Sequence, residues 1–148
     1  MKTIIITGSV GTGKTTLAKR MSKEKNYEYV DVNKIITENK LSSGYDNKRK
    51  CKIIDINKLN KVLIDKIKNS RRSLIIDSHL SHYLPDKYVD LCIVTKCGLK
   101  ELKKRLEKRK YSKAKIKENL ECEIFDVCLN EAKENGHKVK VIVSETQI

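Results

Sequence analysis

A glycine-rich turn near the start of the chain contains the residues with the clearest chemical meaning, Gly8-Ser9-Val10-Gly11-Thr12-Gly13-Lys14-Thr15. The octapeptide matches the pattern G-x-x-x-x-G-K-[ST]. It stands between an apolar β-branched run and a segment compatible with a helix, the context in which this pattern forms a phosphate-binding loop. Glycines let backbone N–H groups turn towards phosphate oxygens, and the N-terminus of the following helix adds partial positive charge. The sequence therefore predicts a site for a phosphorylated ligand.

The residues of this loop have separate expected roles. The glycines, Gly11 and Gly13 among them, allow the backbone to approach the phosphates closely. Lys14 is expected to reach the β- and γ-phosphates of ATP, and the hydroxyl of Thr15 to bind Mg²⁺. Thr16, one residue into the helix, is expected near the α-phosphate. A glycine-rich turn that binds nothing is the alternative, and the presence of both Lys14 and Thr15 argues against it.

An acidic residue, Asp77, ends the apolar run Leu74-Ile75-Ile76. Ligands bind at the carboxyl ends of strands in doubly wound folds, so Asp77 is expected at the same edge of the sheet as the phosphate loop. Mg²⁺ held at a phosphate loop usually has a carboxylate in its outer shell, which makes Asp77 a candidate metal residue acting through water. The alternative is that Asp77 only caps a turn or a helix. The phosphate loop favours the functional interpretation.

The elements that must position these residues follow from apolar periodicity. Strands are expected over residues 2–7, 27–32, 73–77, 89–95 and 139–143, and helices from residue 14 and over 59–67, 99–106 and 116–127. Helices that separate buried strands are typical of an α/β fold, here a mainly parallel five-stranded sheet flanked by helices. The length fits a single domain, residues 1–148.

Composition limits the class of protein. With 39% hydrophobic and 35% charged residues and no apolar run long enough to span a bilayer, a soluble cytoplasmic protein with no membrane partner is expected. The net charge of +14 favours anionic partners such as nucleotides, RNA or an acidic protein, although the abundance of Lys could equally reflect a thermophilic or AT-rich source. The five cysteines form no C-x-x-C pair, which favours buried free thiols over a metal cluster.

A basic stretch follows the fourth expected strand. Residues 100–117 contain ten Lys or Arg and two acids. Within it Arg105 and Arg109 are four residues apart, a spacing that places both on one face of a helix, where they could clamp phosphate oxygens. The remaining charges either cover a solvated helix face or form a contact surface for RNA. Base stacking is not expected, because Tyr111 is the sole aromatic residue in the stretch.

Further motifs occur in order after the phosphate loop: Gly44-Tyr45-Asp46, Asp77-Ser78-His79, Arg105-Leu106-Glu107-Lys108-Arg109-Lys110-Tyr111 and Asn119-Leu120-Glu121-Cys122-Glu123-Ile124-Phe125. Together with the loop they resemble the adenylate kinase isoenzyme 6 family, also called coilin-interacting nuclear ATPases, over nearly the whole chain. The resemblance implies a P-loop NTPase of the nucleoside monophosphate kinase type, with a monophosphate-binding segment at residues 30–53 and a short lid at residues 104–114. It also implies an Mg²⁺-dependent, broad-specificity kinase that converts ATP and AMP to two ADP and has ATPase activity.

The same resemblance implies roles for individual residues. Asp77 and His79 would belong to an Asp-x-His motif, and Arg109 would be the lid arginine that contacts ATP. Lys14 and Arg105 complete the expected catalytic set, since phosphoryl transfer to an acceptor that is already anionic needs cationic side chains rather than a general base. For the monophosphate, Arg49 and Asp46 are the expected contacts.

Three positions depart from the family pattern. Val10 stands in place of the usual proline of the loop, and Lys110 in place of the glycine after the lid arginine, so loop stiffness and lid hinging are expected to differ. Thr37 stands where some members have an arginine for the monophosphate, and Arg49 is its nearest substitute. The acceptor site is therefore less strongly predicted than the donor site.

The resemblance also implies a role in maturation of the small ribosomal subunit, with a platform ribosomal protein and rRNA as partners. Two alternatives to a nucleoside monophosphate kinase stay open. One is an ATP-driven ribosome-assembly switch with little kinase activity, which the basic stretch favours. The other is a small P-loop kinase with a non-nucleotide acceptor.

Overall fold

The computed structural model describes residues 1–46 and 51–144, which form an α/β fold. The strands are β1 (Thr3–Gly8), β2 (Glu28–Asp31), β3 (Ser42–Asp46), β4 (Cys51–Ile54), β5 (Leu74–Asp77), β6 (Leu91–Cys97) and β7 (Val139–Ser144). The helices are α1 (Lys14–Lys25), α2 (Val32–Glu38), α3 (Ile56–Asn69), α4 (Leu99–Lys108), α5 (Lys113–Ile124) and α6 (Val127–Glu134), with single 3₁₀ turns at Ser81–Tyr83 and Asp86–Tyr88.

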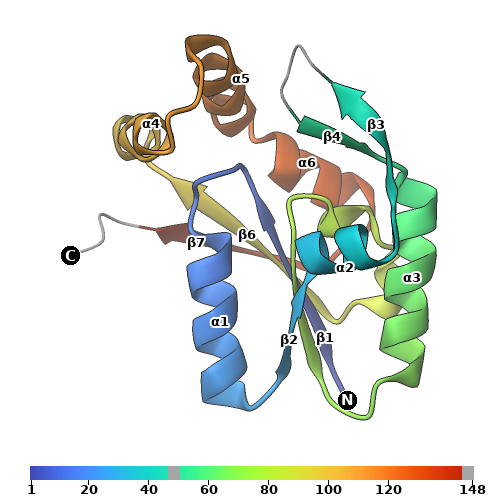
Figure 1. Cartoon of the computed structure of the whole chain (residues 1–148). Coiled ribbons are helices and arrows are strands. Elements are labelled where there is room, and N and C mark those ends of the chain that lie inside the picture. Colours follow the sequence, from blue (N-terminus) through green and yellow to red (C-terminus); the bar gives the residue numbers. More distant parts are fainter. Residues whose placement is uncertain (47–50, 145–148) are drawn as a thin grey trace.

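The main sheet has five strands in the order β2-β5-β1-β6-β7, and every pair of neighbours is parallel (Figure 1). The predicted five-stranded parallel sheet is thus confirmed. Strand β1 lies at its centre, and Ile6 of β1 is in register with Asp77 of β5. Because parallel strands end at the same edge, the loop after β1 and the carboxylate that ends β5 lie side by side.

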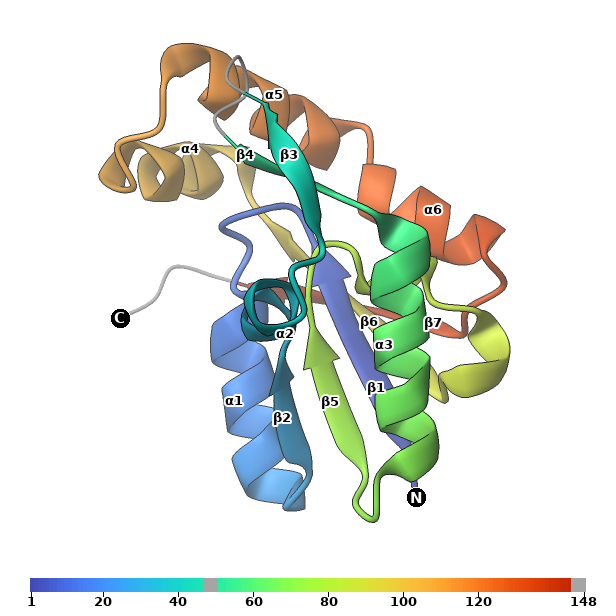
Figure 2. The same ribbon diagram turned by 45° about the vertical axis from the view of Figure 1, so that its right-hand side comes forward.

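Apolar side chains cover both faces of this sheet. On one face α1 contributes Leu17 and Ala18, which pack with Ile4 and Ile75. The other face is covered by α2, α3 and α6, whose buried members include Ile36, Leu59, Leu63 and Ala132. Figure 2 shows α1 on one side of the sheet and α3 and α6 on the other, with α4 and α5 at the end where the phosphate loop lies. Because helices cover both faces, every residue of the neighbouring central strands β1 and β5 is buried.

A two-stranded antiparallel hairpin, β3–β4, was not among the expected elements. Its strands are short and lie in a polar, glycine-containing stretch, so no alternation of apolar residues marks them in the sequence. The hairpin falls inside the predicted monophosphate-binding segment. Arg49 lies outside the described residues, and so does the side chain of Asp46.

The predicted helix over residues 116–127 is wrong in one respect, because the structure divides it into α5 and α6. Helix α5 ends at Ile124, and Asp126 adopts a left-handed conformation with φ of 51° before α6 begins at Val127. The ammonium of Lys96 contacts the carbonyl of Glu123 and the carboxylate of Asp126 at this break. A tertiary ion pair therefore interrupts a periodicity that looks continuous in the sequence.

Cys92 and Cys97 are buried thiols, and the side chains of Cys122 and Cys128 are half-buried. Burial raises the pKa of the Cys92 thiol to about 12, so this group is inert at neutral pH. Among residues 1–46 and 51–144, no three His, Cys, Asp or Glu side chains are grouped to hold a metal. The same residues include no helix with the length and apolar character needed to cross a membrane.

Candidate active site

The phosphate loop connects β1 to α1 and is held by its own backbone and by the end of β6. A Cβ at Gly8 would lie 2.4 Å from Oγ1 of Thr95, so only glycine lets the strand end pass this close to β6. The hydroxyl of Thr12 donates a 2.6 Å hydrogen bond to the carbonyl of Ser9 and lies 2.7 Å from Oγ1 of Thr95. The loop is therefore a closed turn before any ligand binds.

Lys14 is the first residue of α1 and points back over the loop. Its Nζ donates a 3.1 Å hydrogen bond to the carbonyl of Ser9. Gly13, the N-cap of α1, has φ of 93° and leaves the helix end without a side-chain cap, so its N–H groups remain available for an anion. Burial lowers the pKa of Lys14, while the charge of Asp77 opposes this change. The negative charge of a phosphate bound here would stabilise the charged form of the Lys14 ammonium, which burial has removed from water.

Asp77, the last residue of β5, accepts hydrogen bonds from side chains of α1 and β2. The hydroxyl of Thr15 donates a 2.7 Å hydrogen bond to Oδ2 of Asp77, and the phenol of Tyr29 donates a 3.0 Å hydrogen bond to the same oxygen. Asp77 is 8% exposed. Burial of the Tyr29 phenol, together with the nearby charge of Asp77, raises the pKa of Tyr29, so the phenol keeps its proton and acts as a donor. A threonine hydroxyl that gives its proton to a carboxylate keeps its lone pairs for a cation, so the donor set fits Mg²⁺.

These groups line one cavity with a volume of about 460 Å³. The predicted residues that line it are Gly11, Gly13, Lys14, Thr15, Thr16, Asp77, His79 and Arg109. The phosphate loop and α1 form one side of the cavity, the ends of β2 and β5 another, and Arg109 and Tyr111 after α4 a third. Val10 and Tyr111, which are 101 positions apart in the sequence (111 − 10), therefore line the same ligand-sized cavity.

Arg105 is placed differently from Arg109. Its Nη1 donates to the carbonyl of Gly11 at 3.0 Å and to Oγ of Ser144 at 2.9 Å, and its Nε lies 3.3 Å from Oε1 of Glu101. Arg105 thus joins α4 to the phosphate loop and to the end of β7. The exposed Arg109, by contrast, follows the last turn of α4 and lies at the cavity wall.

His79 lies at the cavity with an exposed side chain. The surrounding protein desolvates its ring and, with the charges of Lys14 and His82, lowers the pKa of His79 to about 4. Because the ring is open to solvent, water screens part of this effect. His79 is therefore neutral at pH 7.

Several residues of the site were not predicted from the sequence. Tyr29, Asp31 and Asn33 all line the cavity. Asp31 ends β2 as Asp77 ends β5, and the two strands pair in register at these carboxylates. A carboxylate at the end of an apolar strand was thus a usable signal for Asp31, whereas Tyr29 becomes visible only when the order of the strands is known.

A second hollow of about 280 Å³ adjoins the loop on the side of β7 and shares Gly13 and Thr16 with the main cavity. Its wall combines the apolar Leu17 and Ile142 with Arg20 and with Ser144 at the end of β7. Ser144 ends β7, and residues 145–148 lie outside the described residues.

Comparisons with known proteins agree with this geometry. A family model described as "AAA domain" matches residues 4–126. The chain is 36% identical over 132 residues to an adenylate kinase isoenzyme 6 homolog of Caenorhabditis elegans, covering 89% of this chain and 72% of that protein. It is 37% identical over 136 residues to a putative adenylate kinase of Methanocaldococcus jannaschii, covering 92% of this chain and 75% of that protein.

Among solved structures, a shikimate kinase from Acinetobacter baumannii in complex with shikimate matches with a TM-score of 0.64 and 11% sequence identity. The match covers the whole of this chain and 86% of that chain. At this identity the likeness concerns the fold alone, and it confirms the P-loop kinase fold predicted from the sequence.

Proposed function

Because the chain belongs to the adenylate kinase isoenzyme 6 family, we propose that it transfers the terminal phosphate of MgATP to a nucleoside monophosphate, with AMP as the first acceptor. The observation that supports this most strongly is the cavity in which Lys14, the Thr15–Asp77 pair and Arg109 come together. Each of these groups has a distinct part in phosphoryl transfer, and none is explained by packing alone.

Mg²⁺ is the cofactor that the donor set fits. The hydroxyl of Thr15 would hold it directly, and Asp77 would act through water. A cation held by these two residues would supply positive charge to offset the charge of the nucleotide phosphates.

The protein groups then bind, orient and shield the reactants. Lys14 exchanges the Ser9 carbonyl for the β- and γ-phosphates, and Arg109 approaches the transferred group from the predicted lid, residues 104–114. The acceptor phosphate is anionic, so no side chain has to remove a proton from it. A neutral His79 fits this scheme as a hydrogen-bonding group rather than as a base.

The second hollow and the far side of the main cavity suit the two nucleotides. The hollow that contains Leu17, Ile142 and Ser144 continues from the α1 side of the loop and fits the adenine of ATP. The acceptor is placed on the opposite side, where Asp31 and Asn33 belong to the predicted monophosphate-binding segment, residues 30–53. Arg49 and Asp46 remain the expected cationic and acidic contacts within that segment.

The test is ADP formation from MgATP in the presence of AMP, CMP, GMP or UMP, each measured against hydrolysis without an acceptor. Broad specificity predicts ADP formation above the hydrolysis rate with more than one monophosphate. If no monophosphate raises the rate above hydrolysis, the kinase proposal is wrong.

A second candidate function is supported by the basic stretch. Lys100, Lys103, Lys104, Lys108 and Lys110 are all exposed, which exceeds what a lid over one nucleotide needs. We propose that ATP hydrolysis at the same site also assists small ribosomal subunit maturation in the cytoplasm, through a platform ribosomal protein and rRNA. A pull-down of that protein that is lost on adding ATP would support this role, and no binding in any nucleotide state would rule it out.

A further inference from the structure

The motif at residues 119–125 has no part in the cavity chemistry described above, yet it contains a buried acid. Glu123, in the last turn of α5, is 5% exposed. Its Oε1 accepts a 3.1 Å hydrogen bond from Oγ of Ser9 and lies 3.3 Å from Nζ of Lys96. Its Oε2 accepts a 2.7 Å hydrogen bond from the backbone N–H of Cys97. One carboxylate therefore joins α5 to the phosphate loop and to the end of β6.

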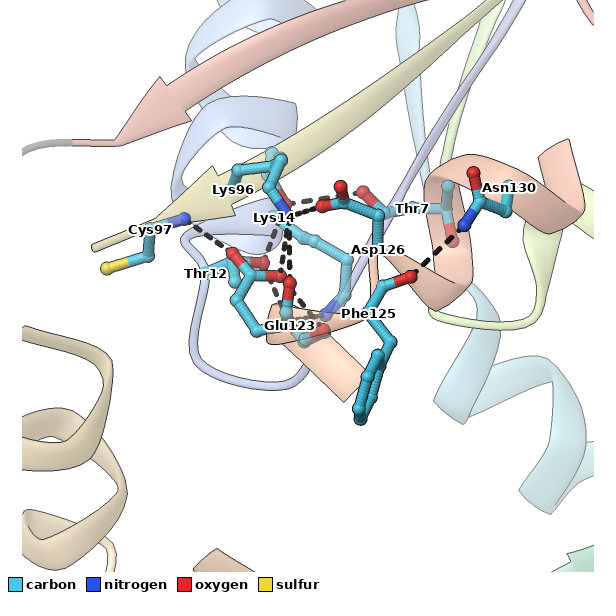
Figure 3. Close-up of polar contacts among 11 residues, drawn as sticks. Thr7, Thr12, Lys14, Lys96, Cys97, Glu123, Phe125, Asp126 and Asn130 are labelled. Carbon is cyan, nitrogen blue, oxygen red and sulfur yellow. Dashed lines mark hydrogen bonds and ion pairs between the residues drawn. The ribbon is translucent and has the colours of Figure 1, made fainter. Parts of the chain in front are cut away.

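Ser9 links this carboxylate to the nucleotide site. Its hydroxyl donates to Glu123, and its carbonyl accepts from the hydroxyl of Thr12 at 2.6 Å and from Nζ of Lys14 at 3.1 Å. Figure 3 shows Glu123, Lys96 and Asp126 gathered beside Thr12 and Lys14. A shift of Ser9 would thus displace both the turn of the loop and the lysine that binds phosphate.

Stability alone is a poor explanation for this arrangement. Burying an ion pair gains little over apolar residues of the same volume, because desolvation offsets the attraction. A buried carboxylate with three donors, on the other hand, fixes the directions of all three. Glu123 is such a group, and it contacts the phosphate loop, whose backbone must be correctly oriented to bind the phosphates of a nucleotide.

We propose that Glu123 is a positioning residue for nucleotide binding: through the hydroxyl of Ser9 it holds the phosphate loop in the shape that places Lys14. The inference rests on the proposed function only in taking MgATP as the ligand of the loop. It adds that α5, the helix after the predicted lid, is anchored directly to the donor site. The carboxylate also lies close enough to Lys14 to favour its charged form.

The test is the Kd of MgATP for wild type, Ser9→Ala, Glu123→Gln and the double variant, measured by calorimetry without an acceptor. The amide of Glu123→Gln turns an N–H₂ group towards one of the donors that the carboxylate had accepted from. Each single change is expected to raise Kd about tenfold, the size of one lost hydrogen bond to a charged group. The double variant is expected to be no worse than either single variant, since both changes break the same link.

A matched control is Glu121→Gln, which removes an exposed acid two residues earlier on the same helix and is expected to leave Kd unchanged. Kinetically, Glu123→Gln should raise KM for ATP and leave KM for AMP unchanged. Losses that multiply in the double variant would show that Glu123 acts elsewhere and would overturn the proposal. Ser9→Ala removes only a hydroxyl and is expected to stay folded, which circular dichroism checks. A wild-type Kd for the folded variant would overturn the proposal whether or not Glu123→Gln folds. A failed kinase assay with intact MgATP binding would contradict the proposed function and leave this test valid.

Discussion

The phenol of Tyr29 donates a 3.0 Å hydrogen bond to Oδ2 of Asp77. The two residues lie on neighbouring parallel strands, β2 and β5, and are 48 positions apart in the sequence. The bond fixes one oxygen of the carboxylate that the proposed mechanism assigns to the Mg²⁺ shell. Tyr29 is therefore expected to support the proposed metal site, beyond its place in the strand.

Tyr29→Phe is expected to raise the Mg²⁺ concentration that gives half-maximal kinase activity. Loss of the phenol leaves Asp77 with one oriented donor fewer, and the penalty should be about ten- to a hundredfold, the range for losing an outer-shell partner of a metal site. The measurement is the ADP formation rate against Mg²⁺ at saturating ATP. Tyr27→Phe, at the start of the same segment, is the control and should leave the Mg²⁺ dependence unchanged. Equal curves for wild type and Tyr29→Phe would contradict the role.

Gly8→Ala is expected to lower the free energy of unfolding by about 2 to 3 kcal/mol, the cost of forcing extra volume into a packed site. The new Cβ would meet Oγ1 of Thr95 at 2.4 Å and the Thr95 carbonyl at 2.7 Å. Gly98→Ala is the matched control, because no atom lies within 4 Å of its Cβ position and its φ of −57° suits alanine. Urea denaturation of the two variants makes the comparison, and equal losses would refute the close-approach argument.

Arg109→Ala is expected to lower kcat by about 10²-fold or more, as for removal of one donor that stabilises the charge of the transition state. The neighbouring Lys108→Ala should change kcat little, since Lys108 lies on the exposed side of α4. Arg105→Ala should instead lower the melting temperature and weaken MgATP binding, because Arg105 holds the Gly11 carbonyl and Ser144. Steady-state kinetics and thermal melts separate these effects. An Arg105→Ala variant with normal stability and a strongly reduced kcat would reverse the assignment.

The free energy of unfolding is expected to fall as the pH is lowered below 6.5, with His82 as one cause. This ring is 1% exposed and lies 2.7 Å from Oγ1 of Thr7, with the side chains of Glu131 and His137 as neighbours. Burial lowers the pKa of His82, while Glu131 opposes the shift. The unfolded chain then takes up a proton near pH 6.5 that the folded protein does not, so stability rises with pH through this window.

His82→Asn should flatten the dependence of the melting temperature on pH between pH 7 and 5, whatever its effect on the melting temperature itself. His79→Asn is expected to flatten the same slope by a smaller amount, because the pKa of His79 is also lowered but solvent screens part of that shift at the exposed ring. A His82→Asn variant with an unchanged slope would show that His82 does not titrate differently on folding.

The parts of the site that depend on local sequence were predictable. The phosphate loop is contiguous, and Asp77 follows a buried apolar run, so each carries its own signal. Tyr29 and Ser9 gain their roles from strand order and from the position of α5, which no local pattern reveals. Hairpin β3–β4 and the helix break at Asp126 were not predicted for the same reason. The hairpin forms by pairing of two short strands in a polar stretch, and the break is accompanied by an ion pair between Asp126 and Lys96, which lies on a different element.

The most direct test of the account is ADP production from MgATP with and without AMP, for wild type and Lys14→Ala. The account predicts that AMP raises the rate at least about tenfold above hydrolysis and that both rates vanish in the variant, since Lys14 is the cation placed for the β- and γ-phosphates. Circular dichroism of Lys14→Ala checks that the fold is intact. A slow rate that AMP leaves unchanged, or an AMP-dependent rate that survives in Lys14→Ala, would contradict the assignment of this loop as the donor site of a nucleoside monophosphate kinase.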